Sequence, residues 1–572
     1  MPVTVIPSQL FTFLLPGAAG STSYYLPYNH TIEAMTGDGL SHNSVQTSHM
    51  IVNVQGRVTS ENVGININRP GSLDLSVGSG ALVHSVESSG ITANGGAGAF
   101  DFINLGYVEG ATNGITVYKS SIDFSNMGTI TGLNYVGASL AVADDVGFVN
   151  EINAVNHGTI NGHQHGMLIN NSDDEGQSFV TNTSVVSGGS FSTDSAGIRV
   201  TNSGDVYIMN SGNISGYFGI LRDYPWVQTT SDDPYYLNVM NSGTISSHML
   251  ENGIGIGLDP LGNPTEPPDT LPEYEEEYVD GTKVAIDVVN TGLIVGRVVG
   301  ADARDWVTNA GTINGDIELG GANDTFDGLG GQVIGDVRGG YGDDLYRIDD
   351  GTTSLIENDG EGTDTVEAAV SHELGDWFEE LTLLGGEDIN GDGNDLSNRL
   401  RGNMGSNRMD GAGETDYMFG RGGSDTMLGG DGDDYISGNS GWDVIRGEAG
   451  NDTILGGAGR DVIDGGEGQD RASYYNAQID GVFASLLNPN NNTGIAYGDS
   501  YFSIEDLWGS TLDDSLYGDD FDNEITGDFG NDVLWGWDGN DYINGMWDND
   551  TIAGNKGDDT LRGGLGVDVF QF

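Results

Sequence analysis

The sequence predicts an all-β chain: a parallel β-helix (solenoid) over residues 1–317, followed by a parallel β-roll over residues 318–572. Two repeats support this prediction. A loose motif, N-x-G-x-I/V-x-G, recurs through the first part, and a nine-residue block, G-G-x-G-x-D-x-U-x with U a large apolar residue, recurs through the second. Self-similarity at a fixed period is typical of solenoids, in which each repeat buries its apolar face against its neighbours.

The repeat of the first part places Asn and Gly at one corner of each expected coil. Alternating polar and apolar residues lie between the corners and indicate short strands. Stacked Asn side chains can hydrogen-bond from coil to coil, as Asn ladders do in cross-β stacks. A β-sandwich array or a β-propeller is the alternative interpretation. The copies of the motif begin at Asn104, Asn126, Asn156, Asn210, Asn241, Asn290 and Asn309.

The nine-residue blocks form two arrays, one from Gly402 to Ser473 and one from Gly509 to Gln571, and a further block begins at Gly339. The glycines permit a tight turn with positive φ angles. The Asp in the sixth position faces this turn together with backbone carbonyls, and such oxygen ligands suit Ca²⁺. The eighth position is apolar and faces the core. The segments at about 348–401 and 474–508 lack clean blocks and are interpreted as spacers.

These blocks, such as GGYGDDLYR at Gly339 and GGDGDDYIS at Gly429, resemble the repeats-in-toxin (RTX) family, also called haemolysin-type calcium-binding repeats. The resemblance implies that two blocks form one coil, so that turns two blocks apart stack and share Ca²⁺, with roughly ten ions in all. Asn407 and Asn523 replace the Asp, and Glu414 replaces a turn glycine, so those sites are expected to be weak or empty. The implied metal ligands are Asp344, Asp416, Asp425, Asp434, Asp443, Asp452, Asp461, Asp470, Asp514, Asp532, Asp541, Asp550, Asp559 and Asp568.

The charge of the chain agrees with this interpretation. The formal net charge is −67, from 86 acidic and 19 basic residues, and 54 of the acidic residues lie from Glu318 onward. Stacked carboxylates repel one another, whereas bound Ca²⁺ reverses the sign of that interaction. We therefore expect the β-roll to fold on meeting extracellular calcium. Nucleic acid and anionic membranes are poor partners for such an acidic surface.

The sequence also bears on localisation. It has no cysteine, so disulfides contribute nothing. No Lys or Arg precedes the short apolar run from Leu10 to Leu15, so no N-terminal signal peptide is expected. No run reaches the roughly 20 apolar residues that span a membrane. The RTX resemblance implies type I secretion and an extracellular or cell-surface location.

For the biological role, the sequence favours a noncatalytic cell-surface, matrix or adhesive protein whose partners include calcium and, as candidates, polysaccharides or a cell surface. The alternative is a secreted polysaccharide-modifying enzyme (a β-helix lyase, epimerase or glycosidase) with an RTX module. The layout resembles that of secreted mannuronan C5-epimerases, but their Asp-Pro-His motif is absent. Acidic doublets at 144–145, 173–174 and 232–233 and aromatic residues in the loop 222–237 are what an enzyme could use. No catalytic residue and no cofactor besides Ca²⁺ are assigned.

Overall fold

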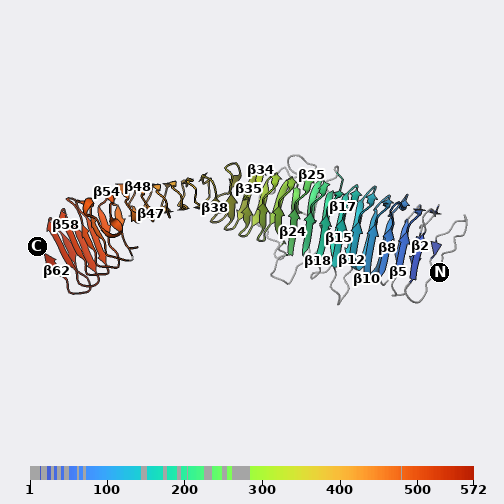
Figure 1. The fold of residues 1–572 in the computed structure, drawn as a ribbon, viewed down its shortest axis with the longest axis horizontal. Helices are drawn as coiled ribbons and strands as arrows, with labels where there is room; N and C mark the ends of the chain where they lie inside the picture. The colour runs from blue at the N-terminus through green and yellow to red at the C-terminus, as the bar shows by residue number, and fades with distance from the viewer. Residues whose placement is uncertain are drawn as a thin grey trace. The chain divides into compact units, whose positions relative to one another are not determined.

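The structure is a computed structural model of the 572-residue chain. It describes residues 13–14, 22–26, 31–34, 40–43, 50–60, 63–68, 72–142, 151–171, 177–189, 195–201, 204–223, 235–247, 254–259, 284–477 and 479–571. The chain divides into two compact units, Met1–Tyr341 and Gly342–Phe572. Both units are built almost wholly from short parallel strands (Figure 1).

The first unit is a parallel β-helix with three stacks of strands, and this confirms the predicted fold class for this part of the chain. All of the strand pairs in its stacks run parallel, and each coil contributes one strand to each stack. One stack, a twelve-stranded sheet, consists of β3 (Thr31–Ala34), β6 (Arg57–Ser60), β9 (Leu82–Ser85), β11 (Tyr107–Gly110), β13 (Thr129–Gly132), β16 (Thr159–Gly162), β19 (Val185–Ser187), β22 (Asn213–Gly216), β25 (Thr244–Ser247), β28 (Leu293–Val295), β31 (Thr312–Asn314) and β34 (Gln332–Ile334).

The other two stacks share the long strands β10 (Ile91–Asn104) and β12 (Ile115–Asn126), whose two ends pair in different stacks. The second stack also contains β2 (Thr22–Leu26), β5 (Met50–Val54), β8 (Leu73–Val77), β15 (Glu151–Asn156), β18 (Gln177–Asn182), β21 (Val206–Asn210), β24 (Tyr235–Asn241), β27 (Val284–Asn290), β30 (Trp306–Asn309) and β33 (Thr325–Asp327). The third also contains β1 (Phe13–Leu14), β4 (Leu40–Asn43), β7 (Ile65–Asn68), β14 (Val136–Val142), β17 (His165–Asn171), β20 (Ala196–Thr201), β23 (Phe218–Asp223), β26 (Ile254–Asp259), β29 (Arg297–Ala301), β32 (Ile317–Gly321) and β35 (Asp336–Tyr341).

A buried ladder of asparagines follows the second stack of the first unit. The Nδ2 group of Asn104 donates to Oδ1 of Asn126 at 2.8 Å, and each later member repeats this bond to the next coil at the same distance. Each Oδ1 also accepts from the backbone N–H two residues on, as Asn126 does from Gly128 at 3.2 Å. The ladder consists of Asn104, Asn126, Asn156, Asn182, Asn210, Asn241, Asn290 and Asn309.

The second unit is a parallel roll. One face carries β36 (Leu345–Ile348), β38 (Thr365–Ala368), β40 (Glu380–Leu383), β42 (Arg399–Arg401), β44 (Tyr417–Phe419), β46 (Tyr435–Ser437), β49 (Thr453–Leu455), β52 (Arg471–Ser473), β55 (Asp506–Trp508), β57 (Glu524–Asp528), β59 (Tyr542–Met546) and β61 (Thr560–Arg562). Short pieces complete it: β37 (Ser354–Ile356), the paired β47 (Ser440–Gly441) and β50 (Ala458–Gly459), and the 3₁₀ turns η1 (Pro489–Asn491) and η2 (Gly494–Ala496).

The opposite face of the roll consists of two further parallel sheets. The first is β39 (His372–Glu373), β41 (Gly391–Asp392), β43 (Arg408–Gly413), β45 (Thr426–Asp431), β48 (Val444–Ala449), β51 (Val462–Glu467) and β54 (Ser500–Phe502). The second is β53 (Phe483–Ser485), β56 (Ser515–Tyr517), β58 (Val533–Asp538), β60 (Thr551–Lys556) and β62 (Val569–Gln571). Strands therefore continue through both segments that the sequence marked as spacers.

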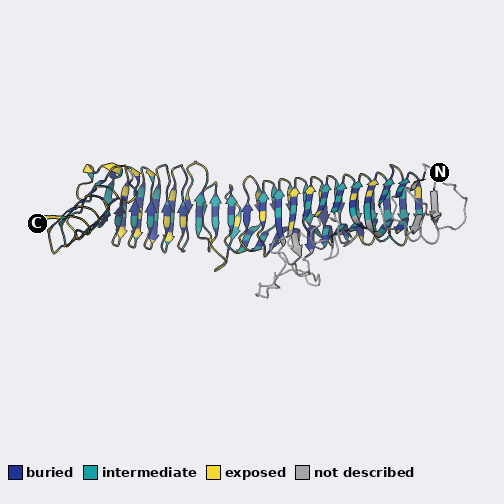
Figure 2. Ribbon diagram, turned by 90° about the horizontal axis from the view of Figure 1, so that it is seen from below, coloured by how far each residue is buried: buried dark blue, intermediate teal, exposed yellow. Residues whose placement is uncertain are grey.

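The core of the roll is the row of eighth-position side chains. In many strands of the roll, such as β43 and β44, buried and more exposed residues alternate, as the pleat of a strand requires. Figure 2 shows buried and more exposed residues along the strands. Toward the last coil the row becomes more exposed, and Phe570 is 40% exposed. The fully buried members are Met418, Met427, Ile436, Ile445, Ile454, Ile463, Leu516, Ile525, Leu534, Ile543 and Ile552, all at 0% exposure. Among the described residues, no helix has the length and apolar character needed to cross a membrane.

Candidate metal centre

The sixth-position Asp residues form ladders along the turns of the roll. Oδ1 of Asp434 accepts a hydrogen bond from the backbone N–H of Asp416, 18 residues earlier, at 2.8 Å. The same bond joins Asp434 to Asp452 and Asp452 to Asp470, at 2.8 and 2.9 Å. The turns that the resemblance paired therefore do lie in adjacent coils. The other joined pairs are Asp425–Asp443, Asp443–Asp461, Asp514–Asp532, Asp532–Asp550, Asp541–Asp559 and Asp550–Asp568.

The second oxygen of most of these carboxylates has a different environment. Each Oδ2 is buried, and no residue in the described part of the chain donates a hydrogen bond to it. A buried carboxylate oxygen without a donor is expensive, because it has lost its water and gained nothing in return. The predicted ligands with such an oxygen are Asp416, Asp425, Asp434, Asp443, Asp452, Asp461, Asp470, Asp532, Asp541 and Asp550.

The first-position glycines show which other oxygens share that space. A Cβ atom added to Gly429 would lie 2.2 Å from Oδ2 of Asp434 and 2.5 Å from the carbonyl oxygen of Gly447. At Gly411 the two distances are 2.2 Å to Oδ2 of Asp416 and 2.3 Å to the carbonyl oxygen of Gly429. A carboxylate oxygen and a carbonyl oxygen from the next coil therefore lie beside one point in these turns, and these are the ligand types that Ca²⁺ prefers.

The electrostatics of the ladder also favour a cation. Burial, with a contribution from the charges of neighbouring Asp residues, raises the pKa of Asp416 and of Asp532 to about 8. Burial likewise raises the pKa of Asp443 and Asp452 to about 7, again with help from neighbouring carboxylates. Burial therefore disfavours the ionised form of these groups, and a bound divalent cation would reverse that preference.

Three predicted ligands differ from this pattern. Both oxygens of Asp514 accept hydrogen bonds from Ser510, and Oδ1 also accepts from the N–H of Val482 at 2.7 Å. Asp559 and Asp568, in the last coils, are half-buried rather than buried. These three carboxylates therefore have either fewer free oxygens or more contact with solvent than the others.

The two Asn replacements fill the turn in another way. Nδ2 of Asn407 donates to the carbonyl oxygen of Ile389 at 2.6 Å, and Oδ1 accepts from the N–H of Asn403 at 2.9 Å. Asn523 donates in the same manner to the carbonyl oxygen of Glu505 at 2.8 Å. At these two turns an amide N–H₂ donor stands where most of the array Asp residues have a carboxylate oxygen without a hydrogen-bond donor. A donor cannot bind a cation, which supports the expectation of weak or empty sites there. Glu414 keeps the turn, with φ of 63°.

Sequence reasoning missed several acidic residues that continue the ladders. Oδ1 of Asp499 accepts from the N–H of Asp461 at 3.0 Å, and Oε2 of Glu505 accepts from the N–H of Asp470 at 3.0 Å. Both lie in or beside the second spacer. Asp364 continues the ladder at Asp344, whose N–H donates to its Oδ1 at 2.8 Å. The signal for Asp364 was present, because GEGTDTV has the G-x-G-x-D-x-U spacing without the first glycine.

The residues that an enzyme could use cannot be placed. The doublets 144–145, 173–174 and 232–233 and most of the loop 222–237 lie outside the described residues. The alternative of a polysaccharide-modifying enzyme is therefore neither supported nor opposed by the geometry of these groups.

Comparison with known families agrees with the geometry of the turns. A family model described as the RTX calcium-binding nonapeptide repeat (4 copies) matches residues 391–427, 401–436, 419–454, 437–472, 508–543, 517–552 and 544–571. No curated protein matches the chain. The C-terminal region, over 391–472 and 508–571, therefore consists of RTX calcium-binding repeats. The matched regions include most of the sixth-position Asp residues described above.

Proposed function

We propose that this chain is a secreted RTX protein whose second unit binds roughly ten Ca²⁺ ions and folds when it meets extracellular calcium. The observation that carries the proposal is the row of buried Oδ2 atoms without donors, most of them beside a backbone carbonyl oxygen. The residues proposed to hold the ions are Asp344, Asp416, Asp425, Asp434, Asp443, Asp452, Asp461, Asp470, Asp514, Asp532, Asp541, Asp550, Asp559 and Asp568.

The difference in calcium concentration between the cytosol and the extracellular space would control when the second unit folds. At submicromolar cytosolic calcium, sites with Kd near 10⁻⁴ M stay empty, whereas millimolar extracellular calcium adds about 1.5–3 kcal/mol per site by mass action. Summed over several sites, this term offsets the repulsion between stacked carboxylates. The chain is therefore expected to pass through a type I secretion channel unfolded and to fold outside the cell.

For the biological role we propose a noncatalytic surface, matrix or adhesive protein. The first unit supports this proposal because its described coils are held together by backbone pairing and by the buried Asn ladder. The test is a binding assay of the full chain, with calcium present, against extracellular polysaccharides and intact cells. Turnover of a polysaccharide, seen as new reducing ends or unsaturated products, would refute the noncatalytic role.

The calcium proposal is tested by circular dichroism of the full chain during titration from EGTA into millimolar Ca²⁺. We expect a large, cooperative gain of β signal, because the second unit should change from coil to strand. Mg²⁺ at the same concentration is the control and should produce little change, since it demands smaller octahedral sites. A β signal that EGTA does not reduce would contradict calcium-dependent folding.

A further inference from the structure

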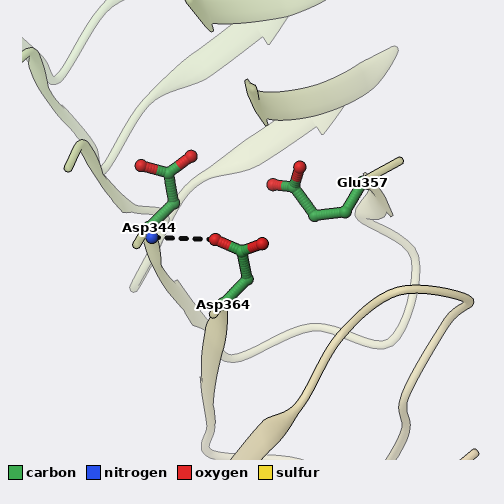
Figure 3. A group of neighbouring side chains, drawn as sticks. All are labelled: Asp344, Glu357 and Asp364. Atoms are coloured by element: carbon green, nitrogen blue, oxygen red, sulfur yellow. Dashed lines mark hydrogen bonds between the residues drawn. The ribbon is translucent and has the colours of Figure 1, made fainter. Parts of the chain in front are cut away.

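A separate acidic site lies near the start of the second unit, outside the two arrays. Asp344 precedes β36, Glu357 follows β37, and Asp364 precedes β38. Figure 3 shows the three carboxylates turned toward one space, and their ligand oxygens lie within 4.8 Å of one another. We refer to Asp344, Glu357 and Asp364 as the three-carboxylate site.

Some buried carboxylate oxygens of this site accept no hydrogen bond from the described residues. Asp364 uses Oδ1 to accept from the N–H of Asp344, and Glu357 uses Oε1 to accept from the hydroxyl of Tyr346. Oε2 of Glu357 and Oδ2 of Asp364 are buried and accept no hydrogen bond from any described residue. The two residues are 5% and 0% exposed, so water does not replace the missing donors at the surface.

The site differs from the array turns in its composition. Asp344 and Asp364 are 20 residues apart, whereas the array pairs are 18 apart. Glu357 follows β37 within this coil and lies in the turn as a third carboxylate. Burial, with a contribution from the neighbouring carboxylates, raises the pKa of Glu357 to about 8 and that of Asp364 to about 7. The site thus concentrates more negative charge than a turn with two Asp residues.

We infer that Asp344, Glu357 and Asp364 together bind one Ca²⁺ ion more tightly than the array turns do, so that this site fills first. A site with three carboxylates should have a higher affinity for Ca²⁺ than a site with two, because the affinity of calcium sites depends on ligand charge and rigidity. The inference deepens the proposed function, and Glu357 is the ligand that neither the nonapeptide pattern nor its 18-residue spacing contains. Tyr346 positions Glu357 through its hydroxyl.

The test counts bound ions on the full chain by equilibrium dialysis against ⁴⁵Ca²⁺ at about 1 µM and at about 1 mM free Ca²⁺, the ranges of sensor and extracellular sites. We expect wild type to hold one ion at the lower concentration and Glu357→Gln and Asp364→Asn to hold none. At the higher concentration both variants should hold one ion fewer than wild type. Asp359→Asn is the matched control, because Asp359 is an exposed carboxylate two residues from Glu357, and it should behave as wild type.

Retention of the low-concentration ion by both Glu357→Gln and Asp364→Asn would overturn the inference, as would an equal loss in Asp359→Asn. Failure of both variants to fold at 1 mM Ca²⁺, seen by circular dichroism, would assign the carboxylates a role in holding the fold and would also overturn it. Asp434→Asn separates this inference from the proposed function. It should keep the low-concentration ion and lose array ions, and if it loses none, the array proposal fails while the three-carboxylate site stands.

Discussion

At the scale of single residues, the second position of most array blocks has a left-handed backbone, and several different amino acids stand there. Gly430 and Gly466 have φ of 114° and 117°, but Glu448, Trp537 and Met546 also have positive values, of 77°, 81° and 80°. A residue with a Cβ atom is strained in this region by roughly 1–2 kcal/mol. The repetition of the turn therefore overrides the preference of the individual residue.

A glycine at such a position should stabilise the roll. We expect Glu448→Gly to raise the free energy of unfolding by about 0.5–1 kcal/mol, because relief of strain outweighs the added freedom of the unfolded chain. Arg446→Gly is the control, since Arg446 is exposed on the same strand and has no positive φ. That change should lower the free energy by about 0.5–1 kcal/mol. Urea unfolding at saturating Ca²⁺ measures both, and effects of the same sign would contradict the argument.

The second residue-scale prediction concerns the array ligands. Asp434 bonds to the coils on both sides, through its Oδ1 to Asp416 and through its N–H to Asp452. Asp434→Asn should keep the fold in calcium, because a carboxamide can donate to a carbonyl as Asn407 does, but it should remove ligands from two calcium sites. Asp431→Asn, at the exposed third position of the same block, should leave the ion count unchanged. Calorimetric titration with Ca²⁺ gives the stoichiometry, and equal counts for the two variants would refute the assigned register.

At the scale of elements, the Asn ladder joins the coils of the first unit through side chains. Asn182 donates to Oδ1 of Asn210 and accepts from Nδ2 of Asn156, both at 2.8 Å. Removal of the Asn182 side chain takes one hydrogen bond from each of these two buried neighbours, and it also takes away the acceptor of the Ser184 N–H. The ladder is therefore most vulnerable in its interior.

Asn182→Ala should lower the free energy of unfolding of the first unit by about 2–4 kcal/mol, since three hydrogen bonds of its side chain are lost and each contributes about 0.5–1.5 kcal/mol. Asn153→Ala is the matched control, because Asn153 lies on the outer side of β15 and makes one side-chain bond, to Asp123. Its effect should stay within about 0.5 kcal/mol. Hydrogen exchange of the coil amides measures both changes, and equal protection in the two variants would contradict the ladder's role.

The Asn ladder and the core of the roll could be predicted from the sequence wherever one residue type recurs at the same position of the repeat. The N-x-G corners predicted all but one member of the Asn ladder, and Asn182 was missed because Ser184 stands where the motif has Gly. The apolar eighth positions predicted the core of the roll for the same reason. Glu357 and Asp499 could not be found in this way, because each reaches its turn from a segment that does not have the length of a nine-residue block. Their positions become clear only when the whole coil is seen.

At the scale of the whole molecule, the carboxylates determine how stability depends on pH. In EGTA, the raised pKa values of about 6–8 in the array mean that the folded second unit binds more protons than the unfolded chain above pH 4. Stability must then fall as pH rises from about 4 to 8, because stability falls wherever the native state binds more protons. In saturating Ca²⁺ the trend should reverse over the same range, since protons compete with the ions for the carboxylates.

Circular dichroism at several pH values measures both slopes: in EGTA through the β signal, which should appear only as the pH falls toward about 4, and in Ca²⁺ through the Tm. Asp532→Asn should flatten the EGTA slope, because the pKa of Asp532 is among the most strongly raised. Asp520→Asn is the control, since Asp520 is exposed, and it should retain the wild-type slope. A β signal in EGTA that grows as the pH rises would show that the buried carboxylates do not govern folding.

The Asp ladders also have a direction. In the array pairs from Asp416 to Asp568, the backbone N–H of the earlier sixth-position Asp donates to Oδ1 of the Asp 18 residues later, and the reverse bond does not occur in these pairs. At the sixth position, the turn of one coil is therefore completed by the coil that follows it in the chain. If the C-terminal end leaves a secretion channel first, each newly emerging coil meets an acceptor that is already in place. Assembly outside would then act as a ratchet, since every coil that docks opposes the return of the chain into the channel.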